Sequence, residues 1–540
     1  MGSISKTEIC IIGGGIAGIV AAIELLDKGK SVTIVDRDLG SELGGLAKWA
    51  FGGMFFVDTK HQRRNGIKDS IELAKKDWYS YAQFDKYEVW GKIWANEYIE
   101  TCTEKGYHWL RHKGLDFFSV INWAERGMFE DGNSVPRFHM VWGTGWELVK
   151  ILKHQLLNHS NKENLQLLFQ HRVQDLITTN KKVVGCRGQN ERTLSPFELH
   201  AERTIIATGG INGSIEKVKE NWDKSLGVAP DRILNGAHKF ATGDLHESVD
   251  LIKGNVTNLE KQWNYAMGIK HYKQRKPDHG LSLVPCKSAL WLNAKGERIG
   301  PTPLVSGYDT RFLIEQITKQ EHKYSWHLLN RKIALKEFAI SGSEHNPAIK
   351  NKQFLRFIFN VIFGNRKLVD KVVDKCEDIV VAKNLETLVS KMNSLGNPVQ
   401  VDLNKLISEV ENYDSLIDGG SPYSDMQHQM ILNARKWRGD RARTCNLQKI
   451  GSPTAGPFIA IRSFIVSRKS LGGIQTNLNC EVLNKPDKEG KQSIIPGLYA
   501  IGEAAGFGGG GIHGYRSLEG TFLGSCVITG RKCAEAINLN

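Results

Sequence analysis

The pattern of hydrophobic and polar positions near the start of the chain alternates between strand-like and helix-like segments. Residues 8–12 are a short, largely apolar run rich in isoleucine, which is typical of a parallel strand buried on both faces. A glycine-rich turn follows, and residues 19–26 have helical character. Residues 31–36 form a second strand-like run that ends in Asp36. The pattern therefore predicts a strand, a turn, a helix and a second strand, in that order.

The glycines between the first strand and the helix have the spacing of a dinucleotide-binding fingerprint. Gly13 permits a tight turn, Gly15 lets the backbone approach a pyrophosphate, and Gly18 allows the helix to pack closely on the strand. Asp36 lies 18 residues beyond Gly18, where an acid accepts ribose hydroxyls. The alternative is a tight strand–helix turn that binds nothing, but the second strand and its terminal acid favour a nucleotide site.

Later segments extend this glycine-rich pattern. Residues 44–54 hold two glycine pairs, and residues 203–210 form a strand-like run that ends in small residues. Residues 496–511 form another such run, which passes through Glu503 into four consecutive glycines. A helical stretch over residues 520–531 closes the chain.

In this order, these elements resemble flavoproteins of the fumarate reductase / succinate dehydrogenase superfamily, and most closely its branch of FAD-binding dehydrogenases and 3-ketosteroid dehydrogenases. The resemblance covers roughly residues 5–250 and 450–540 and is much weaker between them. It implies an α/β fold, in which a Rossmann-type FAD-binding domain is formed by residues 1–255 and 451–540. An inserted α+β capping domain that holds the substrate would occupy residues 256–450, where segments such as 326–338 and 383–392 have apolar spacing near the helical period.

The resemblance also assigns residues to FAD. The first glycines would hold the pyrophosphate, Asp36 the adenosine ribose and Glu503 the ribityl chain, while the final helix would direct its positive end at the flavin. The full set is Gly13, Gly14, Gly15, Ala17, Gly18, Asp36, Arg37, Gly44, Gly45, Leu46, Gly52, Gly53, Val173, Ala207, Thr208, Gly209, Asp244, Glu503, Leu518, Gly520 and Thr521. Members that attach FAD covalently carry a histidine near the second glycine cluster. Residues 40–54 contain none, so we expect FAD to be bound non-covalently.

The chemistry of a flavin indicates what else the site needs. Oxidising or reducing a carbon–carbon bond next to a carbonyl requires a proton-transfer residue and an electrophile for the developing enolate. The resemblance places Tyr515 and Arg516 where they would position or polarise the carbonyl, and Arg311 where it would donate a proton. Lys469, and Tyr265 with Trp263, stand where fumarate reductases carry substrate-binding histidines.

Each of these candidates also has a structural interpretation. Tyr515 and Arg516 would satisfy backbone carbonyls near the last helix, and Arg311 would be a surface arginine. Lys469 would belong to a solvated charge pair, and Tyr265 with Trp263 would be core residues.

Departures from the family patterns bear on the substrate. Arg516 falls one place before the carboxylate-binding arginine of fumarate reductases, and both of their substrate histidines are absent. The tyrosine that ketosteroid dehydrogenases carry near residues 507–511 is also missing, unless Tyr515 replaces it. We expect an apolar enone, such as a 3-ketosteroid, with a fumarate reductase-like dicarboxylate enzyme as the alternative. A non-catalytic flavin-binding partner and a nicotinamide-binding protein are further alternatives.

Composition narrows the class of protein and its partners. The chain carries 72 basic and 58 acidic residues, a net charge of +14, but its basic residues are dispersed and it has no nucleic-acid motif. Nine cysteines without a C-x-x-C pair exclude a zinc ribbon, and His513 has no second ligand at metal spacing, so no metal is expected. We expect a small-molecule substrate and a separate, unidentified electron donor or acceptor, but no nucleic acid.

The chain is also expected to lack an integral membrane segment. Its longest uncharged stretch is 15 residues, shorter than the ~20 that a spanning helix needs, and its start lacks the features of a secretory signal. A cytoplasmic location follows. Residues 354–366 are very apolar with basic residues among them; this pattern favours a packed helix but leaves room for peripheral membrane contact.

Overall fold

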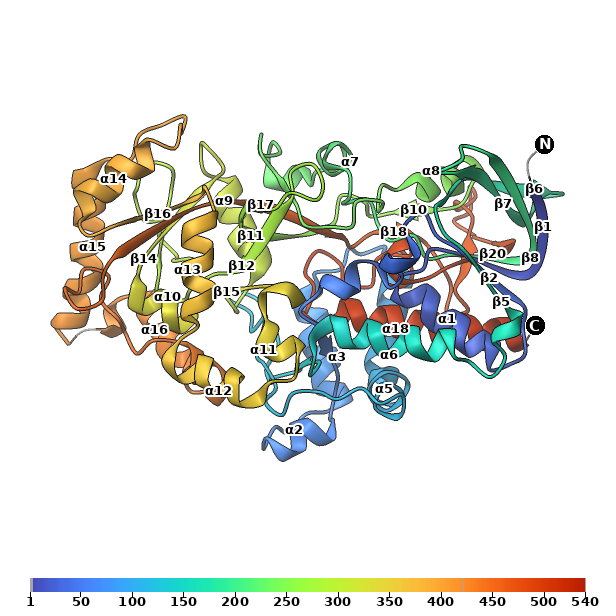
Figure 1. Cartoon of the computed structure of the whole chain (residues 1–540), viewed down its shortest axis with the longest axis horizontal. Coiled ribbons are helices and arrows are strands. Elements are labelled where there is room, and N and C mark those ends of the chain that lie inside the picture. Colours follow the sequence, from blue (N-terminus) through green and yellow to red (C-terminus); the bar gives the residue numbers. More distant parts are fainter. Residues whose placement is uncertain (1–2, 421, 540) are drawn as a thin grey trace.

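The computed structural model describes residues 3–420 and 422–539. Two large sheets lie toward opposite ends of the long axis (Figure 1). The strands of the first sheet are β19 (Glu481–Leu483), β20 (Ile494–Ala500), β8 (Pro196–Ile206), β1 (Ser3–Ile12), β2 (Val32–Val35) and β5 (Leu165–Leu168) in spatial order. In addition, β7 (Lys182–Asn190) pairs with β8, and β6 (His171–Thr179) pairs with β7.

The centre of the first sheet is parallel. β1 pairs with β2 on one side and β8 on the other, and β20 and β5 extend the parallel order outward. The predicted strands over residues 8–12 and 31–36 are therefore neighbours. Their isoleucines and valines are buried, because helices and the β6–β7 excursion cover the two faces.

Helices α1 (Ile16–Leu26), α6 (Thr144–Leu157) and α18 (Thr521–Leu539) form a layer against this sheet (Figure 1). Gly18 and Gly530 allow close packing: a Cβ on Gly18 would lie 2.1 Å from the carbonyl oxygen of Gly13, and one on Gly530 would lie 2.7 Å from that of Ala17. The first and last helices of the chain are thereby packed together, which joins the two predicted parts of the FAD-binding domain.

The second sheet is mostly antiparallel. Its strands in spatial order are β13 (Leu290–Leu292), β14 (Ser325–Asn330), β17 (Phe458–Ser470), β11 (Gln262–Lys270), β12 (Gly280–Val284) and β15 (Ala339–Ile340), with β16 (Ile379–Ala382) and β9 (Leu234–Asn235) also paired to β17. Apolar side chains of helices α13 (Arg366–Lys375), α14 (Leu385–Asn393) and α15 (Leu403–Asp418) share one core with these strands. This is the α+β layer expected for a capping domain.

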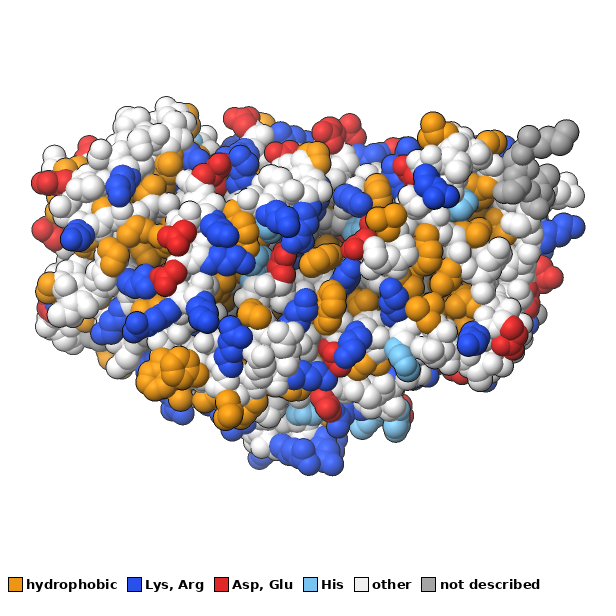
Figure 2. All heavy atoms as spheres, in the orientation of Figure 1, with side chains coloured by type: hydrophobic (Ala, Val, Ile, Leu, Met, Phe, Trp, Pro, Cys, Tyr) orange, Lys and Arg blue, Asp and Glu red, His pale blue; other side chains and the backbone are white. Residues whose placement is uncertain are grey.

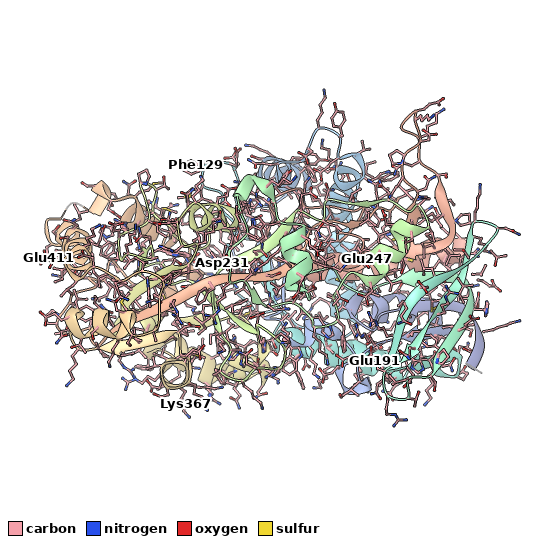
Figure 3. The ribbon with its side chains drawn as sticks, turned by 90° about the horizontal axis from the view of Figure 1, so that it is seen from above. Phe129, Glu191, Asp231, Glu247, Lys367 and Glu411 are labelled. Atoms are coloured by element: carbon pink, nitrogen blue, oxygen red, sulfur yellow. The ribbon has the colours of Figure 1, made fainter. Side chains whose placement is uncertain are left out.

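Strand β17 is the organising strand of the second sheet. It pairs with β14, β16, β11 and β9, and Figure 3 shows it running along the long axis of the molecule. The sheet thus reaches from Leu234 to Ser470 and extends beyond the predicted capping range of 256–450 at both ends. The domain limits themselves stay a prediction.

Two sequence-based expectations in this region need correction. The first half of the helix-like segment 326–338 belongs to strand β14, because its backbone pairs with β13 on one side and β17 on the other, and only α10 (Arg331–Glu337) is helical. The apolar segment 354–366 contains helix α12 (Phe354–Phe363), but none of the helix's residues is buried. Packing alone therefore does not account for its apolar sequence.

The remaining helices are α2 (Lys60–Arg64), α3 (Ile71–Ala82), α4 (Val89–Thr101), α5 (Trp109–His112), α7 (Ile215–Glu220), α8 (Asp244–Leu251), α9 (Thr310–Thr318), α11 (Pro347–Lys350), α16 (Met426–Ala434) and α17 (Arg438–Arg443). The short strand pairs are β3 (Gly53–Phe55) with β4 (Phe138–Met140) and β10 (Val256–Thr257) with β18 (Gly473–Ile474). Within the described ranges, no helix combines the length and apolarity needed to cross a bilayer.

Candidate active site

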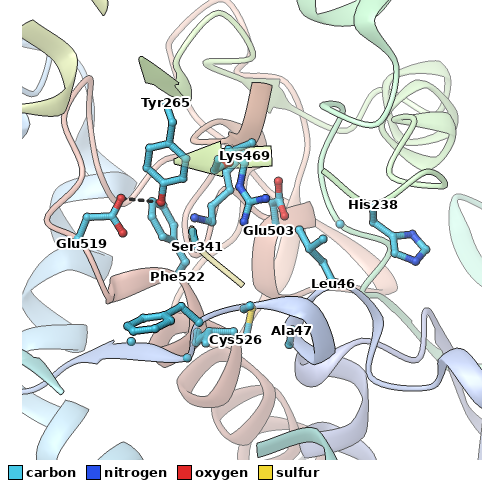
Figure 4. A pocket seen from close by; sticks show the side chains of 18 of the residues that line it. Leu46, Ala47, His238, Tyr265, Ser341, Lys469, Glu503, Glu519, Phe522 and Cys526 are labelled. Atoms are coloured by element: carbon cyan, nitrogen blue, oxygen red, sulfur yellow. Dashed lines mark hydrogen bonds between the residues drawn. The ribbon is translucent and has the colours of Figure 1, made fainter. Parts of the chain in front are cut away.

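A cavity of about 580 Å³ lies between the carboxyl ends of the parallel strands and the second sheet. Gly13, Asp36 and Ala207, which follow β1, β2 and β8, line one part of its wall. Tyr265 from β11 and Lys469 from β17 line another part (Figure 4). The cavity therefore occupies the crevice where open α/β sheets bind their ligands, and the second sheet closes it.

The first turn of α1 is built to receive a phosphate group. Gly13 has φ +112°, and a Cβ there would lie 2.4 Å from the carbonyl oxygen of Ala207. Gly15, by contrast, has ordinary backbone angles, and a Cβ on it would meet nothing within 4 Å. No side chain caps the helix, so its first backbone N–H groups remain for an anion.

Asp36 is held in place at the end of β2. Its carboxylate accepts a hydrogen bond from the backbone N–H of Gly14 at 2.5 Å and from that of Asp38 at 2.7 Å. These bonds fix the side chain against the glycine turn while it still lines the cavity. This is the position in which a carboxylate accepts ribose hydroxyls.

The loop that contains the second glycine cluster lies directly beside the first. The N–H of Gly44 donates to the carbonyl oxygen of Gly14 at 2.8 Å, and Gly44 and Gly45 both have positive φ. A Cβ on Gly52 would lie 2.6 Å from the backbone nitrogen of Gly145, and one on Gly520 would lie 2.7 Å from that of Phe55. These glycines keep the wall thin where a flat ring system would pass.

Charged side chains surround the nucleotide end of the cavity. The guanidinium of Arg37 stacks on the ring of Phe240 at 4.3 Å. Asp244 accepts hydrogen bonds from Thr242 and Arg172, each at 2.7 Å. Although burial by itself raises the pKa of Asp244, these hydrogen bonds and the arginine charge lower it below its ordinary value, so the carboxylate is charged.

Most residues assigned to FAD line this cavity. They are Gly13, Gly15, Ala17, Asp36, Arg37, Gly44, Gly45, Leu46, Gly52, Gly53, Val173, Ala207, Thr208, Gly209, Asp244, Glu503 and Gly520. Four others do not line it: Gly14 donates to Asp36, Gly18 packs on Gly13, and Leu518 and Thr521 are buried at the start of α18. Their predicted contact with FAD stays a prediction, and the structure assigns them supporting contacts.

Glu503, Lys469 and Cys526 lie together at the other end of the cavity (Figure 4). Glu503 accepts a hydrogen bond from the backbone N–H of Ser470 at 3.0 Å, and burial raises its pKa to about 7. Burial lowers the pKa of Lys469 to about 8, although the charge of Glu519 opposes this shift. The Lys469 ammonium lies 3.7 Å from the centre of the Phe522 ring. The Lys469 ammonium thus lies over an aromatic ring in the cavity wall, and the alternative of a solvated surface charge is wrong.

Tyr265, Trp263 and Glu519 form a hydrogen-bonded group next to Lys469. The Tyr265 hydroxyl donates to Oε1 of Glu519 at 2.7 Å, and Nε1 of Trp263 donates to the same oxygen at 2.8 Å. Burial, followed by the charge of Glu519, raises the pKa of Tyr265 well above its ordinary value. Tyr265 therefore remains a neutral hydroxyl that faces the cavity (Figure 4).

Four acidic residues of the cavity wall were not expected from the sequence: Glu125, Glu337, Asp440 and Glu519. Glu519 lies just before the last helix, and Glu125 lies in a loop with φ +50°; both line the cavity. Burial, followed by the charge of Glu519, raises the pKa of Glu125 to about 8. Glu519 and Glu125 belong to no motif, and the only local signal was that Glu519 stands immediately before Gly520, the glycine that precedes the final helix.

The three predicted catalytic residues lie outside the cavity wall. Arg311 on α9 forms an ion pair with Asp223 at 2.5 Å, and Arg516 pairs with Asp309 at 3.2 Å. The ring of Tyr515 lies 4.2 Å from the Lys261 ammonium. These side chains join the capping helix α9 to the loop before α18. Their action on a substrate stays a prediction. The charges of Arg311 and Arg516 are already paired within the protein.

Comparisons with known proteins agree with this geometry. The sequence model of the FAD binding domain family matches residues 8–523. This chain belongs to that family. It is 39% identical over 537 residues to a KsdD-like steroid dehydrogenase of Mycolicibacterium smegmatis, covering 96% of each protein. It is 40% identical over 546 residues to one of Mycobacterium tuberculosis, covering 97% of this chain and 94% of that protein.

Solved structures share the fold. A 3-ketosteroid Δ1-dehydrogenase from Sterolibacterium denitrificans, in complex with 1,4-androstadiene-3,17-dione, has a TM-score of 0.71 at 16% identity and covers 99% of this chain and 100% of that one. An open conformation of a flavocytochrome c3 fumarate reductase has a TM-score of 0.67 at 19% identity, covering 98% and 78%. The predicted superfamily, the α/β fold with its capping layer, and FAD as cofactor are confirmed. The protein is an FAD-dependent oxidoreductase.

Proposed function

We propose that this protein oxidises or reduces a carbon–carbon bond next to the ketone of an apolar, steroid-like substrate. The observation that carries the proposal is the group of Tyr265, Glu519 and Lys469, which the two sheets bring to one end of the FAD-binding cavity. The 39–40% identity to KsdD-like steroid dehydrogenases over nearly the whole chain supports the same substrate class.

The cavity wall near this group suits an apolar molecule. Leu283 and Leu313 from the capping layer and Phe138, Phe507 and Phe522 from the FAD-binding side line it. Binding sites for small apolar ligands combine such walls with a few polar groups that set the orientation. The ammonium of Lys469 and the hydroxyl of Tyr265 are polar groups of that kind.

When bound, FAD supplies the hydride exchange. Residues 40–54 contain no histidine, so the FAD would be held non-covalently. Lys469, charged below a pH of about 8, is placed to attract the carbonyl oxygen and the negative charge of the enolate. A proton leaving the carbon next to the carbonyl would reach Oη of Tyr265 as the Tyr265 hydroxyl proton moves to Oε1 of Glu519. The reverse movement serves reduction. Trp263 positions Glu519 through its indole N–H.

Turnover assays distinguish this proposal from its alternatives. Purified protein should absorb near ~450 nm, as flavins do, and should reduce an oxidising dye in the presence of a 3-ketosteroid. Strong turnover of fumarate with a reduced dye, abolished by Arg516→Ala, would establish the dicarboxylate alternative. Bound flavin that no two-electron substrate reduces would indicate a non-catalytic protein, and a colourless protein would indicate nicotinamide binding.

The Tyr265→Phe variant tests the assignment of the proton-transfer residue. We expect kcat with a 3-ketosteroid to fall by about a hundredfold or more, with unchanged flavin absorbance, because the variant loses only the hydroxyl that exchanges the proton. Tyr324→Phe is the matched control: Tyr324 is also buried near the second sheet, its hydroxyl has no hydrogen-bond partner among the described residues, and it does not line the cavity. If Arg311→Gln abolished turnover and Tyr265→Phe did not, the sequence-based assignment of Arg311 would replace ours.

A further inference from the structure

Helix α12 presents an apolar surface to the outside of the molecule. Leu355, Phe359, Ile362 and Phe363 are 84, 58, 61 and 61% exposed. Their spacing of four, three and one residues places them on one side of a helix. We call these four side chains the apolar face. Figure 2 shows apolar side chains gathered over α12 at the lower left, and exposed groups of this kind mark interaction sites.

The opposite side of α12 anchors the helix to the protein. The ring of Phe357 lies 4.9 Å from that of Phe118 and 6.4 Å from that of Trp142. The helix also packs against α11 and α10. Because its inner side already has partners, the helix cannot turn its apolar face inward without losing these contacts.

The charges around α12 indicate what the apolar face binds. From residue 345 to residue 369 the chain carries five basic residues and no acidic one. Arg356, Arg366 and Lys367 are exposed, whereas the ammonium of Lys352 already pairs with Glu147 at 3.0 Å. Lys367 lies at the edge of the molecule in Figure 3. The whole chain has a net charge of +14. The complementary surface is therefore apolar inside and negatively charged at its rim.

We propose that α12 docks this protein on an anionic phospholipid bilayer. The apolar face would enter the boundary between headgroups and acyl chains, and the basic residues would contact lipid phosphates. The helix has 10 residues, too few to span a bilayer, so it would lie in the plane of the interface.

The position of α12 indicates how docking on a bilayer would serve the active-site cavity. A hollow of about 140 Å³ beside the helix is lined by Arg356 and Phe357, and it shares Asn346 and Arg443 with the active-site cavity. When the protein is docked on a bilayer, this hollow would lie next to the lipid phase in which apolar compounds dissolve. This consequence rests on the proposed function, whereas the docking itself does not.

Vesicle sedimentation of the holoenzyme tests the docking without any substrate. We expect the protein to bind phosphatidylcholine vesicles that contain phosphatidylglycerol, to bind pure phosphatidylcholine vesicles more weakly, and to dissociate as salt is raised. The double variant Leu355→Ser/Phe359→Ser should lower vesicle partitioning by at least about tenfold, since two apolar side chains no longer leave water. Leu194→Ser is the matched control, because Leu194 is 65% exposed on the FAD-binding side.

A second variant keeps the test valid if the first is poorly folded. Arg366→Ala/Lys367→Ala should weaken binding to the anionic vesicles only. Flavin absorbance and dye-linked turnover in vesicle-free buffer should match the wild type in both variants. The proposal is overturned if wild-type protein does not bind anionic vesicles, or if Leu355→Ser/Phe359→Ser binds them as well as the wild type. It is also overturned if sedimentation shows that the wild type is a dimer and that Leu355→Ser/Phe359→Ser is a monomer, since a second copy of the chain would then cover the apolar face.

Discussion

Gly15 and Gly18 belong to one loop, yet the structure gives them different physical roles. A Cβ added to Gly18 would lie 2.1 Å from the carbonyl oxygen of Gly13, whereas one added to Gly15 would meet nothing within 4 Å. Gly15 also has φ −72°, which any residue adopts. Packing of α1 on β1 therefore requires Gly18, whereas Gly15 is predicted to be needed only for the approach of a ligand.

The Gly15→Ala and Gly18→Ala variants should separate these roles. We expect Gly15→Ala to keep the wild-type thermal midpoint of its apoprotein but to bind FAD at least about tenfold more weakly, because the added methyl group fills space that a phosphate needs. Gly18→Ala should lower the midpoint of the apoprotein as well, because the methyl group overlaps backbone. Flavin titration and thermal unfolding check both. Full FAD affinity in Gly15→Ala would contradict the placement of the pyrophosphate.

Lys469 leads to a prediction about pH. Burial lowers its pKa to about 8, so the ammonium is charged below that pH and is lost as the pH rises through it. If the ammonium stabilises the enolate, kcat/KM for a 3-ketosteroid should fall as the pH rises above about 8. In Lys469→Met this alkaline fall should disappear, and kcat/KM should be lower throughout the range below it. An unchanged pH profile in the variant would exclude Lys469 from the reaction.

At the scale of elements, a buried ion-pair group ties α3 to β4. The guanidinium of Arg137 contacts Asp69 at 2.7 Å and Asp77 at 2.6 Å, and its side chain is fully buried. Asp69 lies just before α3 and Asp77 lies within it. Such a group costs desolvation when it forms, but removing one partner leaves charges buried without compensation.

The Arg137→Met variant should therefore lower the free energy of unfolding by about 3–5 kcal/mol. Arg63→Ala is the control: it breaks the exposed pair with Asp58, whose side chains are 65% and 45% exposed, and such pairs contribute at most about 1 kcal/mol. Denaturant unfolding of the two variants gives the comparison. Equal losses would show that Asp69 and Asp77 find other partners.

The elements also show where sequence patterns stop being decisive. The strand–turn–helix–strand unit could be predicted because its signals are local: period, glycine positions and a terminal acid. Residues 326–338 have apolar spacing near the helical period, yet residues 325–330 form strand β14. Pairing with β13 and β17 makes residues 325–330 a strand, and the partner of Ser325 is Ser463, 138 residues away in the chain. No local pattern contains that information.

At the scale of the whole molecule, FAD would contact both sheets. The cavity wall combines Gly13, Asp36 and Glu503 from the first sheet's side with Tyr265 and Lys469 from the second. A ligand that spans such a cavity binds the folded state only, and it stabilises that state by mass action. Bound flavin would therefore help to hold the capping layer on the FAD-binding layer.

Flavin removal should accordingly lower the thermal midpoint of this protein. At an FAD concentration one hundred times its Kd, the folded state gains about 2.7 kcal/mol, so the midpoint of the apoprotein should rise with added FAD. Differential scanning calorimetry of stripped protein, titrated with FAD, measures this rise. Gly15→Ala should need more FAD for the same rise, and a midpoint that does not respond to FAD would contradict the site.

The sequence by itself indicated the dinucleotide-binding unit, because its strands, its glycine spacing and Asp36 are local signals. The resemblance of the ordered glycine-rich elements to the superfamily then indicated FAD as the cofactor. Only the tertiary structure decided which side chains meet beside it. The antiparallel register of β11 and β17 sets Trp263 opposite Lys469, and the loop before α18 brings Glu519 to Tyr265 and Trp263. These residues are separated by as many as 256 positions, and their contact depends on sheet register and on the packing of the two layers, which no single stretch of sequence encodes.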